Sequence, residues 1–318
     1  MTLGPPPFAA GVHIPWSRAP QSVHDWAHSV GGGAPRKVRD LTGGFSPGAI
    51  ALVEFEGREV FFKAVGAQLN PDSPNFHRRE ARVSANLPRS PMLPQLLATY
   101  DDGQWVALAY ESVRGRLPQV PWQEDELGRA VESLGRLHDL LTPSPLMDVA
   151  PSREHLGDLF CGWRHLAAMD DVPHELDDWS RSHLEQLANL ESGWTEAAEG
   201  NTLIHGDVRS DNMVIAEQGV VFVDWPHASV GSPVLDLVEW APSVVLEGGP
   251  DPEELLARHG PSRGAEREAV NALLAAFAGF LTEHALRAAP VGLPTLRPFQ
   301  GAQAREARRW LAERTGWR

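Results

Sequence analysis

Alternating apolar and polar positions dominate the chain between residues 36 and 112. Residues 36–55 predict two strands joined by a tight turn, and residues 57–65 predict a third strand that pairs with the second through a hairpin. Residues 93–112 predict two more strands around a glycine-containing turn. The pattern therefore predicts five strands in this part of the chain.

Two helices accompany these strands. Residues 22–30 predict a short helix inside a Pro- and Gly-rich N-terminal extension, which we assign to residues 1–35. Residues 71–87 predict a longer helix, which Asp72 or Ser73 can cap at its start. We expect the five strands and the longer helix to form one small lobe.

Helical spacing replaces the alternation beyond Pro121. Residues 122–142 carry apolar side chains at intervals of three and four residues, which indicates an amphipathic helix. Only residues 202–225 interrupt the helical pattern, with two short apolar stretches that predict a hairpin. We therefore assign residues 1–112 to a small β-rich lobe and residues 113–318 to a larger helical lobe. Further helices are predicted within residues 153–168, 173–199, 225–240, 252–259, 263–288 and 300–315.

Composition limits the compartment and the partners. Of the 318 residues, 42% are hydrophobic and 22% are charged, as in ordinary globular proteins. The sequence contains no run of about 18 apolar residues, so we expect no membrane span, and the N-terminus lacks the pattern of a signal peptide. The single cysteine, Cys161, cannot form an internal disulfide. We interpret it as a packed helix residue and expect a cytoplasmic protein.

The formal net charge of −14 is distributed unevenly. Residues 1–112 hold ten acidic and ten basic side chains, whereas residues 113–318 hold 32 acidic and 18 basic ones. Such an acidic protein is a poor partner for nucleic acid. The acidic lobe can attract a cationic small molecule, or its charges can lie on solvated helix faces. Charge alone leaves both interpretations open.

The strongest chemical pattern is the segment TLIHGDVRSDNMVIAEQGVVFVDW, residues 202–225. Asp207 and Asn212 are separated by four residues, as in the catalytic loop of kinases, where the Asp meets the acceptor hydroxyl and the Asn holds magnesium. The predicted hairpin brings Asp224 beside Asn212. A carboxylate and an amide oxygen suit Mg²⁺, which keeps water and phosphate oxygens at its other positions. The alternative is a polar loop followed by a surface hairpin.

The motif HGDVRSDN, followed by VDW, resembles the aminoglycoside phosphotransferase and choline kinase family, which is related to the protein kinases. Gly206 and Trp225 stand where protein kinases have the Arg of H-R-D and the Phe of D-F-G, which favours the branch acting on small molecules. The resemblance extends over about residues 36–245. It implies an α+β, protein-kinase-like fold of two lobes with ATP in the cleft: a small β-rich N-terminal lobe and a larger helical C-terminal lobe.

Lys63 is one of only two lysines among 28 basic residues, so its place at the end of a predicted strand is distinctive. An ammonium on a strand can reach the phosphates of ATP as a compact charge. The resemblance implies that Glu80 pairs with it. A surface lysine, and a local pairing of Glu80 with neighbouring arginines, are the alternatives.

Two more segments complete the expected nucleotide site. Glycines in the first turn let the backbone donate N–H groups to phosphate oxygens, although a plain hairpin turn remains an alternative. The resemblance implies a hinge after the fifth strand, where backbone groups bind adenine. The expected turn residues are Gly43, Gly44 and Ser46, and the expected hinge residues are Tyr110, Glu111 and Val113.

These patterns predict transfer of the γ-phosphate of ATP to a hydroxyl of a small molecule. Asp207 would accept or orient the hydroxyl proton, while Asn212 and Asp224 would hold Mg²⁺. A cationic, hydroxylated acceptor of the aminoglycoside type is the leading candidate. The alternatives are a metabolic kinase for choline, a sugar or a hydroxy amino acid, and a non-catalytic nucleotide-binding protein.

Two further residues have expected structural roles. Asp236 resembles a residue that, in relatives, binds the backbone of the catalytic loop, and His138 is interpreted as a structural helix histidine. Asp236 follows Asp224 so closely, without an A-P-E segment, that little room remains for the activation loop of a protein kinase.

Overall fold

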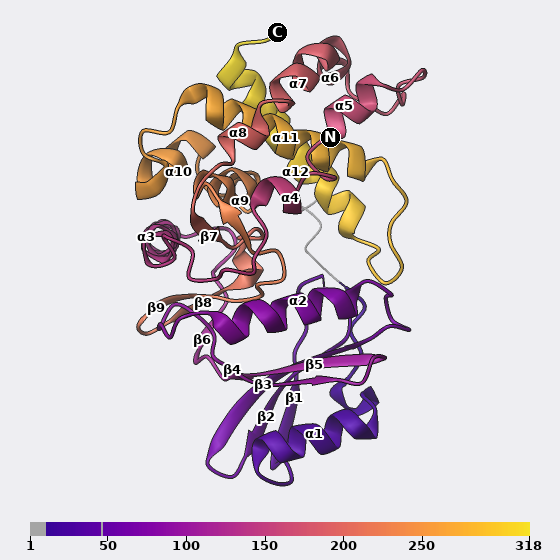
Figure 1. Ribbon diagram of the computed structural model, residues 1–318, viewed down its shortest axis with the longest axis vertical. Helices are drawn as coiled ribbons and strands as arrows, with labels where there is room; N and C mark the ends of the chain where they lie inside the picture. Colours follow the sequence, from indigo (N-terminus) through magenta and orange to yellow (C-terminus); the bar gives the residue numbers. More distant parts are fainter. Residues whose placement is uncertain (1–10, 46) are drawn as a thin grey trace.

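The computed structural model describes residues 11–45 and 47–318. Ser46, one of the expected phosphate-binding residues, lies outside the described residues, as do residues 1–10. The chain forms the two-lobed, kinase-like fold expected from the sequence, with a strand-rich small lobe below and a helical large lobe above in Figure 1.

A five-stranded antiparallel sheet with the order β1-β2-β3-β5-β4 forms the small lobe. Helix α1 covers one face of this sheet and α2 lies on the face toward the large lobe (Figure 1). Alternate side chains of β2, from Ala49 to Phe55, are buried and share a core with Val23 and Ala27 of α1. The elements are β1 (Lys37–Asp40), β2 (Ala49–Phe55), β3 (Arg58–Gly66), β4 (Leu96–Asp101), β5 (Trp105–Glu111), α1 (Gln21–Gly31) and α2 (Ser73–Asn86).

The start of α2 differs from the prediction. Neither Asp72 nor Ser73 caps the helix with its side chain. The amide oxygen of Asn70 accepts hydrogen bonds from the backbone N–H groups of Asp72 (3.0 Å) and Ser73 (2.9 Å). Asn70 can satisfy these donors because the side chain of an Asn can accept hydrogen bonds from backbone N–H groups two and three residues further along the chain.

The large lobe is built around α11, whose side chains are buried along most of its length. Helices α5, α7, α8, α9 and α12 all pack against α11. The C-terminal helix α12, predicted over residues 300–315, makes the most extensive of these contacts with α11. The longer helices are α3 (Glu124–Leu140), α7 (Leu184–Glu191), α9 (Val234–Leu246), α10 (Pro252–Arg258), α11 (Arg267–Ala285) and α12 (Leu296–Thr315), with short 3₁₀ turns η1 (Trp16–Arg18) and η3 (Gly260–Ser262).

The long helices predicted over residues 153–168 and 173–199 are wrong. Each stretch is divided into short helices by irregular segments that contain Gly157 and Gly193 among other residues. Glycine costs a helix roughly 1 kcal/mol relative to alanine. Packing against α11 holds α5, α7 and α8, whereas α4 packs on β10 (Ser229–Gly231) and α6 on α7. They are α4 (Ser152–His155), α5 (Gly162–Ala167), α6 (Asp178–Ser182), α7 and α8 (Trp194–Ala197).

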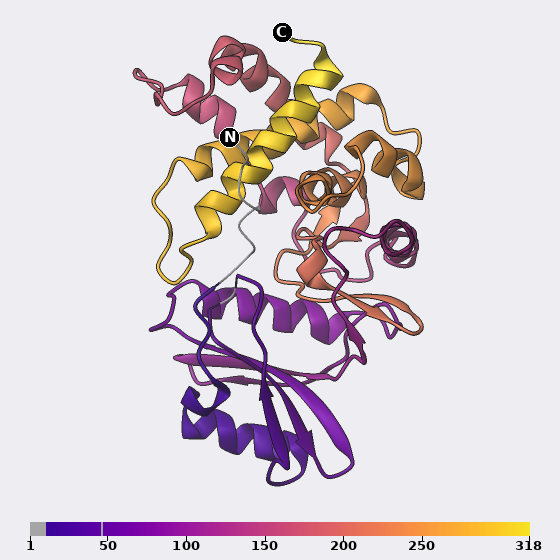
Figure 2. The same cartoon turned by 180° about the vertical axis from the view of Figure 1, so that it is seen from behind.

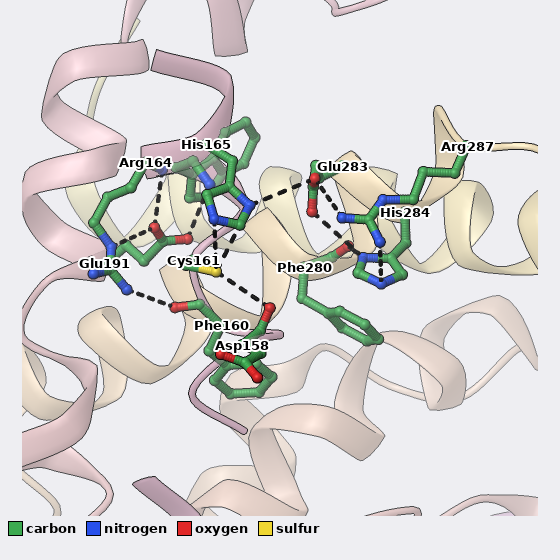
Figure 3. A network of polar contacts seen from close by, with 11 residues as sticks. Asp158, Phe160, Cys161, Arg164, His165, Glu191, Phe280, Glu283, His284 and Arg287 are labelled. Carbon is green, nitrogen blue, oxygen red and sulfur yellow. Dashed lines mark hydrogen bonds and ion pairs between the residues drawn. The ribbon is translucent and has the colours of Figure 1, made fainter. Parts of the chain in front are cut away.

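Cys161 immediately precedes α5 and packs as a small buried residue. Its thiol lies 3.3 Å from His165 Nε2 and donates to the carbonyl oxygen of Asp158, also at 3.3 Å (Figure 3). Burial raises the pKa of the thiol, which disfavours the reactive thiolate. The interpretation of Cys161 as a packed residue is confirmed, but its placement within a helix is wrong, since α5 begins one residue later.

Short strands form much of the segment 202–225, which carries the motif described above. β8 and β9 form the predicted hairpin, and β6, which directly follows the small lobe, pairs with β8. A second small sheet joins β7 to β10. The bounds are β6 (Gly115–Arg116), β7 (Thr202–Ile204), η2 (Ser210–Asn212), β8 (Met213–Ala216), β9 (Gly219–Phe222) and β10 (Ser229–Gly231).

The connection between α11 and α12 reaches from the large lobe to the small one (Figure 2). The N–H of Val12 donates to the carbonyl oxygen of Gly292 (3.0 Å), and the Asn70 amide donates to that of Val291 (2.8 Å). On α2, Arg79 donates to the carbonyl oxygen of Ala228 (3.1 Å). These hydrogen bonds link the small lobe to the large lobe at the connection between α11 and α12 and at Ala228.

In the described chain, none of the helices combines the length and apolar character needed to cross a membrane.

Candidate active site

Asp236 of α9 fixes the backbone of the loop after β7. Its Oδ1 accepts a hydrogen bond from Gly206 N (2.7 Å), and its Oδ2 accepts one from His205 N (2.9 Å). His138 Nε2 lies 2.8 Å from the same Oδ2. Burial opposes ionisation of Asp236, but its hydrogen-bond partners hold its pKa below the ordinary value. The expected structural roles of Asp236 and His138 are confirmed.

Gly206 and His205 shape this loop, residues 205–212, which we call the catalytic loop. Gly206 has a φ of 74°, and a Cβ there would lie 2.5 Å from the carbonyl oxygen of His227. His205 Nε2 donates to the carbonyl oxygen of Val223 (2.9 Å), while Nδ1 accepts from Asp207 N (3.2 Å). Burial lowers the pKa of His205, so the neutral ring ties the loop to the segment that leads into Asp224.

Asp207 lies at the centre of the catalytic loop. Asn212 Nδ2 donates both to the Asp207 carboxylate (2.9 Å) and to its backbone oxygen (2.8 Å). Arg209 Nη1 donates to Asp207 Oδ1 at 2.9 Å, while its Nε and Nη2 each bind Asp211 at 2.9 Å. Burial raises the pKa of Asp207 to about 7, although Arg209 acts in the opposite direction. A carboxylate with this pKa suits general base catalysis near neutral pH.

Asp224 follows the β9 strand in a left-handed backbone conformation, with a φ of 69°. Among the described residues no other non-glycine residue has a positive φ. Asp tolerates this conformation better than most side chains, and such backbone often occurs at functional sites. The β8–β9 hairpin and the hydrogen bond from Val223 N to Asn212 O (2.9 Å) place the backbone of Asp224 beside that of Asn212.

Lys63 of β3 connects the two lobes through two carboxylates. Its Nζ forms ion pairs with Glu80 of α2 and with Asp224 Oδ1, the latter at 2.6 Å. Burial works against the charged ammonium, but Asp224 and Glu80 together raise the pKa of Lys63. Burial likewise opposes ionisation of Asp224, yet Lys63 holds the pKa of that carboxyl well below its usual range. The Lys63–Glu80 pair expected from the sequence is present.

The two expected metal ligands supply oxygen atoms of the kind that Mg²⁺ prefers. Asn212 uses its Nδ2 on Asp207, and no described residue donates to its Oδ1. Residues 11–45 and 47–318 contain no group of three or more His, Cys, Asp or Glu side chains able to hold a metal. The donor set therefore fits an ion that takes most of its ligands from water and phosphate, as Mg²⁺ does beside a nucleotide.

The glycine turn between β1 and β2 lies across from the catalytic loop. Gly43 and Gly44 have φ values of 132° and 75°, and each has open space where a Cβ would be. The Phe45 ring lies 5.2 Å from the Phe299 ring of α12, and the Arg209 guanidinium lies 5.1 Å from the Phe45 centroid. The turn thus contacts both the catalytic loop and α12.

The expected hinge residues have different surroundings. Tyr110 is buried in β5, and its hydroxyl donates to Glu80 Oε1 (2.8 Å), so its side chain supports the Lys63 partner. The N–H of Glu111 already donates to the carbonyl oxygen of Gln95 (2.9 Å). Val113 lies beyond the end of β5. Adenine binding by this segment stays a prediction.

Sequence reasoning missed four charged or titratable residues around the site: Arg209, Glu239, His77 and His227. Burial lowers the pKa of His77 to about 3 and that of His227 to about 4, so both rings are neutral beside Asp224. Arg209 lies inside the quoted motif, and Glu239 follows Asp236 by three residues. These positions within or near the motif could have identified Arg209 and Glu239 as site residues from the sequence.

The acidic surplus of the large lobe lies mainly on its surface. Most of the acidic side chains between residues 113 and 200 are exposed, and Glu126 and Glu191 are the buried exceptions. Both buried carboxylates are paired, with Arg116 and Arg164 respectively. The overall charge is therefore a weak guide to the acceptor, and the side chains beside Asp207 become the better guide.

Known proteins resemble this chain in sequence pattern and in fold. The sequence model of the phosphotransferase enzyme family matches residues 37–260. No match was found among curated protein sequences.

Three solved structures illustrate the similarity of fold. A choline kinase from Streptococcus pneumoniae has a TM-score of 0.61 at 12% identity, covering 92% of this chain and 98% of its own. A microcompartment-associated aminopropanol kinase has a TM-score of 0.57 at 17% identity, and the match covers 94% of this chain and 99% of the kinase. A spectinomycin phosphotransferase in complex with ADP and spectinomycin has a TM-score of 0.53 at 12% identity, with 92% and 93% covered.

Proposed function

The chain belongs to the phosphotransferase enzyme family, and from that membership we propose that it transfers the γ-phosphate of ATP to a hydroxyl group of a cationic small molecule. The observation that carries the proposal is the placement of Asp207. Its carboxylate lies in a loop fixed by Asp236 and is held by Asn212 and Arg209. This arrangement suits a base that meets an acceptor hydroxyl.

Asp207 accepts or orients the proton of that hydroxyl. Its raised pKa, about 7, keeps the carboxylate basic enough for the task at neutral pH. Asn212 and Asp224 would hold Mg²⁺, which supplies positive charge to the transferred phosphoryl group. Catalysis of this kind depends mainly on position and charge, since the phosphoryl group moves with little covalent help from the protein.

Lys63 positions the phosphates of the nucleotide. Glu80 of α2 holds the Lys63 ammonium and is itself bound by the Tyr110 hydroxyl. The glycine turn with Gly43 and Gly44 offers backbone N–H groups to the phosphates. Val113, beyond β5, offers backbone groups to adenine. We expect this reaction in the cytoplasm, where the single cysteine would remain a thiol.

An aminoglycoside-type molecule is the first acceptor that we propose, and a small amino alcohol is the second. The similar structures support both, since one acts on spectinomycin, one on choline and one on aminopropanol. All three molecules combine a hydroxyl group with a cationic nitrogen. A neutral sugar, a hydroxy amino acid and a non-catalytic nucleotide-binding role are the remaining alternatives.

Labelled ATP with a panel of acceptors tests the proposal. The panel contains aminoglycosides, choline, 1-amino-2-propanol, neutral sugars and hydroxy amino acids, each at low and high salt. We expect phosphate transfer to cationic acceptors, weakened by salt if surface charge contributes. Efficient transfer to neutral acceptors alone would reject the cationic class, and tight ATP binding without transfer to any acceptor would favour the non-catalytic role.

A further inference from the structure

Glu239 is a buried carboxylate whose partner does not come from the described part of the protein. The residue lies in α9 and is only 9% exposed. Within residues 11–45 and 47–318, no side chain or backbone group forms a hydrogen bond or ion pair with it. Two other carboxylates near the catalytic loop are bound: the buried Asp236 by the loop backbone, and the half-buried Glu247 by Ser210 (2.5 Å) and Trp122 (2.8 Å).

The Glu239 side chain lies on the side of α9 that faces the catalytic loop. It follows Asp236 by three residues, so the two side chains share one helix face. One turn further, Ser243 accepts a hydrogen bond of 2.6 Å from Gln303 of α12. Gln303 in turn follows Phe299 by one helical turn, and the Arg209 guanidinium lies 5.7 Å from the Phe299 ring. Glu239 therefore lies between the catalytic loop and α12.

The carboxylate oxygens of Glu239 also face accessible space. Among the described residues, the buried side-chain atoms that are fully enclosed and lack a partner belong to His13, His155 and Trp240, and not to Glu239. An unpartnered carboxylate can remain in such a place when water or a ligand reaches it. Burial, and then the nearby Asp236 and Asp207, raise the pKa of Glu239 well above the ordinary value. Without a partner the side chain is therefore held as the neutral acid, and a cation bound beside it would favour the ionised carboxylate.

We infer that Glu239 is the residue that recognises a protonated amine or guanidinium group of the acceptor while its hydroxyl meets Asp207. This inference rests on the proposed phosphotransferase function and adds the group that selects the acceptor. A cationic group here would neutralise a carboxylate that the protein leaves unpaired, and it would do so in a partly buried place where a charge-assisted hydrogen bond is strong. The acceptor class is therefore a hydroxylated amine, with the nitrogen on the α9 side of the hydroxyl.

The test compares Glu239→Gln with the wild type on matched acceptors. Kanamycin and 1-amino-2-propanol are each measured beside their N-acetylated forms, which keep the hydroxyls and lose the positive charge. We expect the substitution to raise KM for the free amines by about 10–100-fold, the range for a lost charge-assisted hydrogen bond. KM for ATP and for the acetylated acceptors should not change, and the melting temperature should not fall, because Gln has nearly the shape of the neutral acid and no hydrogen bond of the protein is lost.

Glu283→Gln is the matched control. Glu283 is also a largely buried glutamate of the large lobe, but it is paired with Arg287 and lies beside His284 and His165 (Figure 3). Its substitution removes the same formal charge at a partnered position. An equal rise of KM in both variants would mean that only the overall charge matters and would overturn the role of Glu239.

Calorimetric titration of the same four probes separates this inference from the proposed function. Loss of amine affinity in Glu239→Gln supports the recognition role even where phosphate transfer is slow. Unchanged amine affinity and KM in this variant would overturn the role while leaving the phosphotransferase intact. Binding and transfer restricted to the acetylated acceptors in the wild type would reject the amine class itself.

Discussion

Asp236→Ala should damage both the stability and the activity of the protein. The substitution removes the acceptor of two buried donors, His205 N and His138 Nε2, and of one half-buried donor, Gly206 N. A buried donor without a partner costs about 1–3 kcal/mol. Water entering the vacated space can satisfy some of the donors, so we expect the free energy of unfolding to fall by roughly 3–6 kcal/mol.

Chemical denaturation at neutral pH measures this loss. Asp236→Asn keeps one carbonyl oxygen and should lose about half as much. Asp251→Ala provides the control, because the Asp251 carboxylate also accepts a backbone N–H, that of Glu253 (2.9 Å), but at the surface. An exposed helix cap of this kind contributes about 1 kcal/mol.

Turnover should fall in Asp236→Ala even at temperatures where the variant stays folded, because the loop that carries Asp207 loses its anchor. An unfolding free energy within about 1 kcal/mol of the wild type, below the cost of one orphaned donor, would refute the reasoning. It would mean that His205 and the hairpin hold the loop without Asp236.

Three further outcomes are expected. Asp224→Ala and Asn212→Ala should lose magnesium-dependent turnover; rates titrated against Mg²⁺ check this, and an unchanged midpoint in both variants contradicts the metal assignment. Asp207→Asn should bind ATP normally but turn over about 10²–10⁴-fold more slowly. The Asp207 carboxylate must lose its proton to act, so wild-type kcat/KM should rise with pH through about 7. Arg209→Gln should move that midpoint upward, because Arg209 lowers the pKa of Asp207. A pH-independent rate speaks against Asp207 as the base. Lys63→Ala should raise KM for ATP more than Lys37→Ala, because Lys63 is buried between two carboxylates and Lys37 is exposed in β1; equal effects in steady-state kinetics would argue against the phosphate role.

The sequence was most informative where function depends on local spacing. The positions of Asp207, Asn212 and Asp224 follow from one loop and one hairpin, so their proximity along the backbone was predictable. The Lys63–Glu80 pair was predictable only through the family resemblance, because β3 and α2 meet by tertiary packing. Local cues were less reliable for helix boundaries.

Other features depend on which way side chains point across elements distant in sequence. The binding of Arg209 to both Asp207 and Asp211, and its contact with Phe45 and Phe299, require the glycine turn and α12 to meet at the catalytic loop. Glu239 faces the catalytic loop only because the hydrogen bonds of Asp236 orient α9 against that loop. Neither orientation follows from composition or periodicity, because both depend on contacts between elements far apart in the sequence.

The bonds between the lobes have a consequence for how the protein melts. Val12 and Asn70 bind the connection before α12, Arg79 binds the segment before β10, and Lys63 is paired with Asp224. Each bond joins residues of the small lobe to residues far along the chain. The sheet lobe cannot unfold without exposing polar groups of the helical lobe, so heating should give one calorimetric transition whose enthalpy belongs to the whole chain rather than two separate ones.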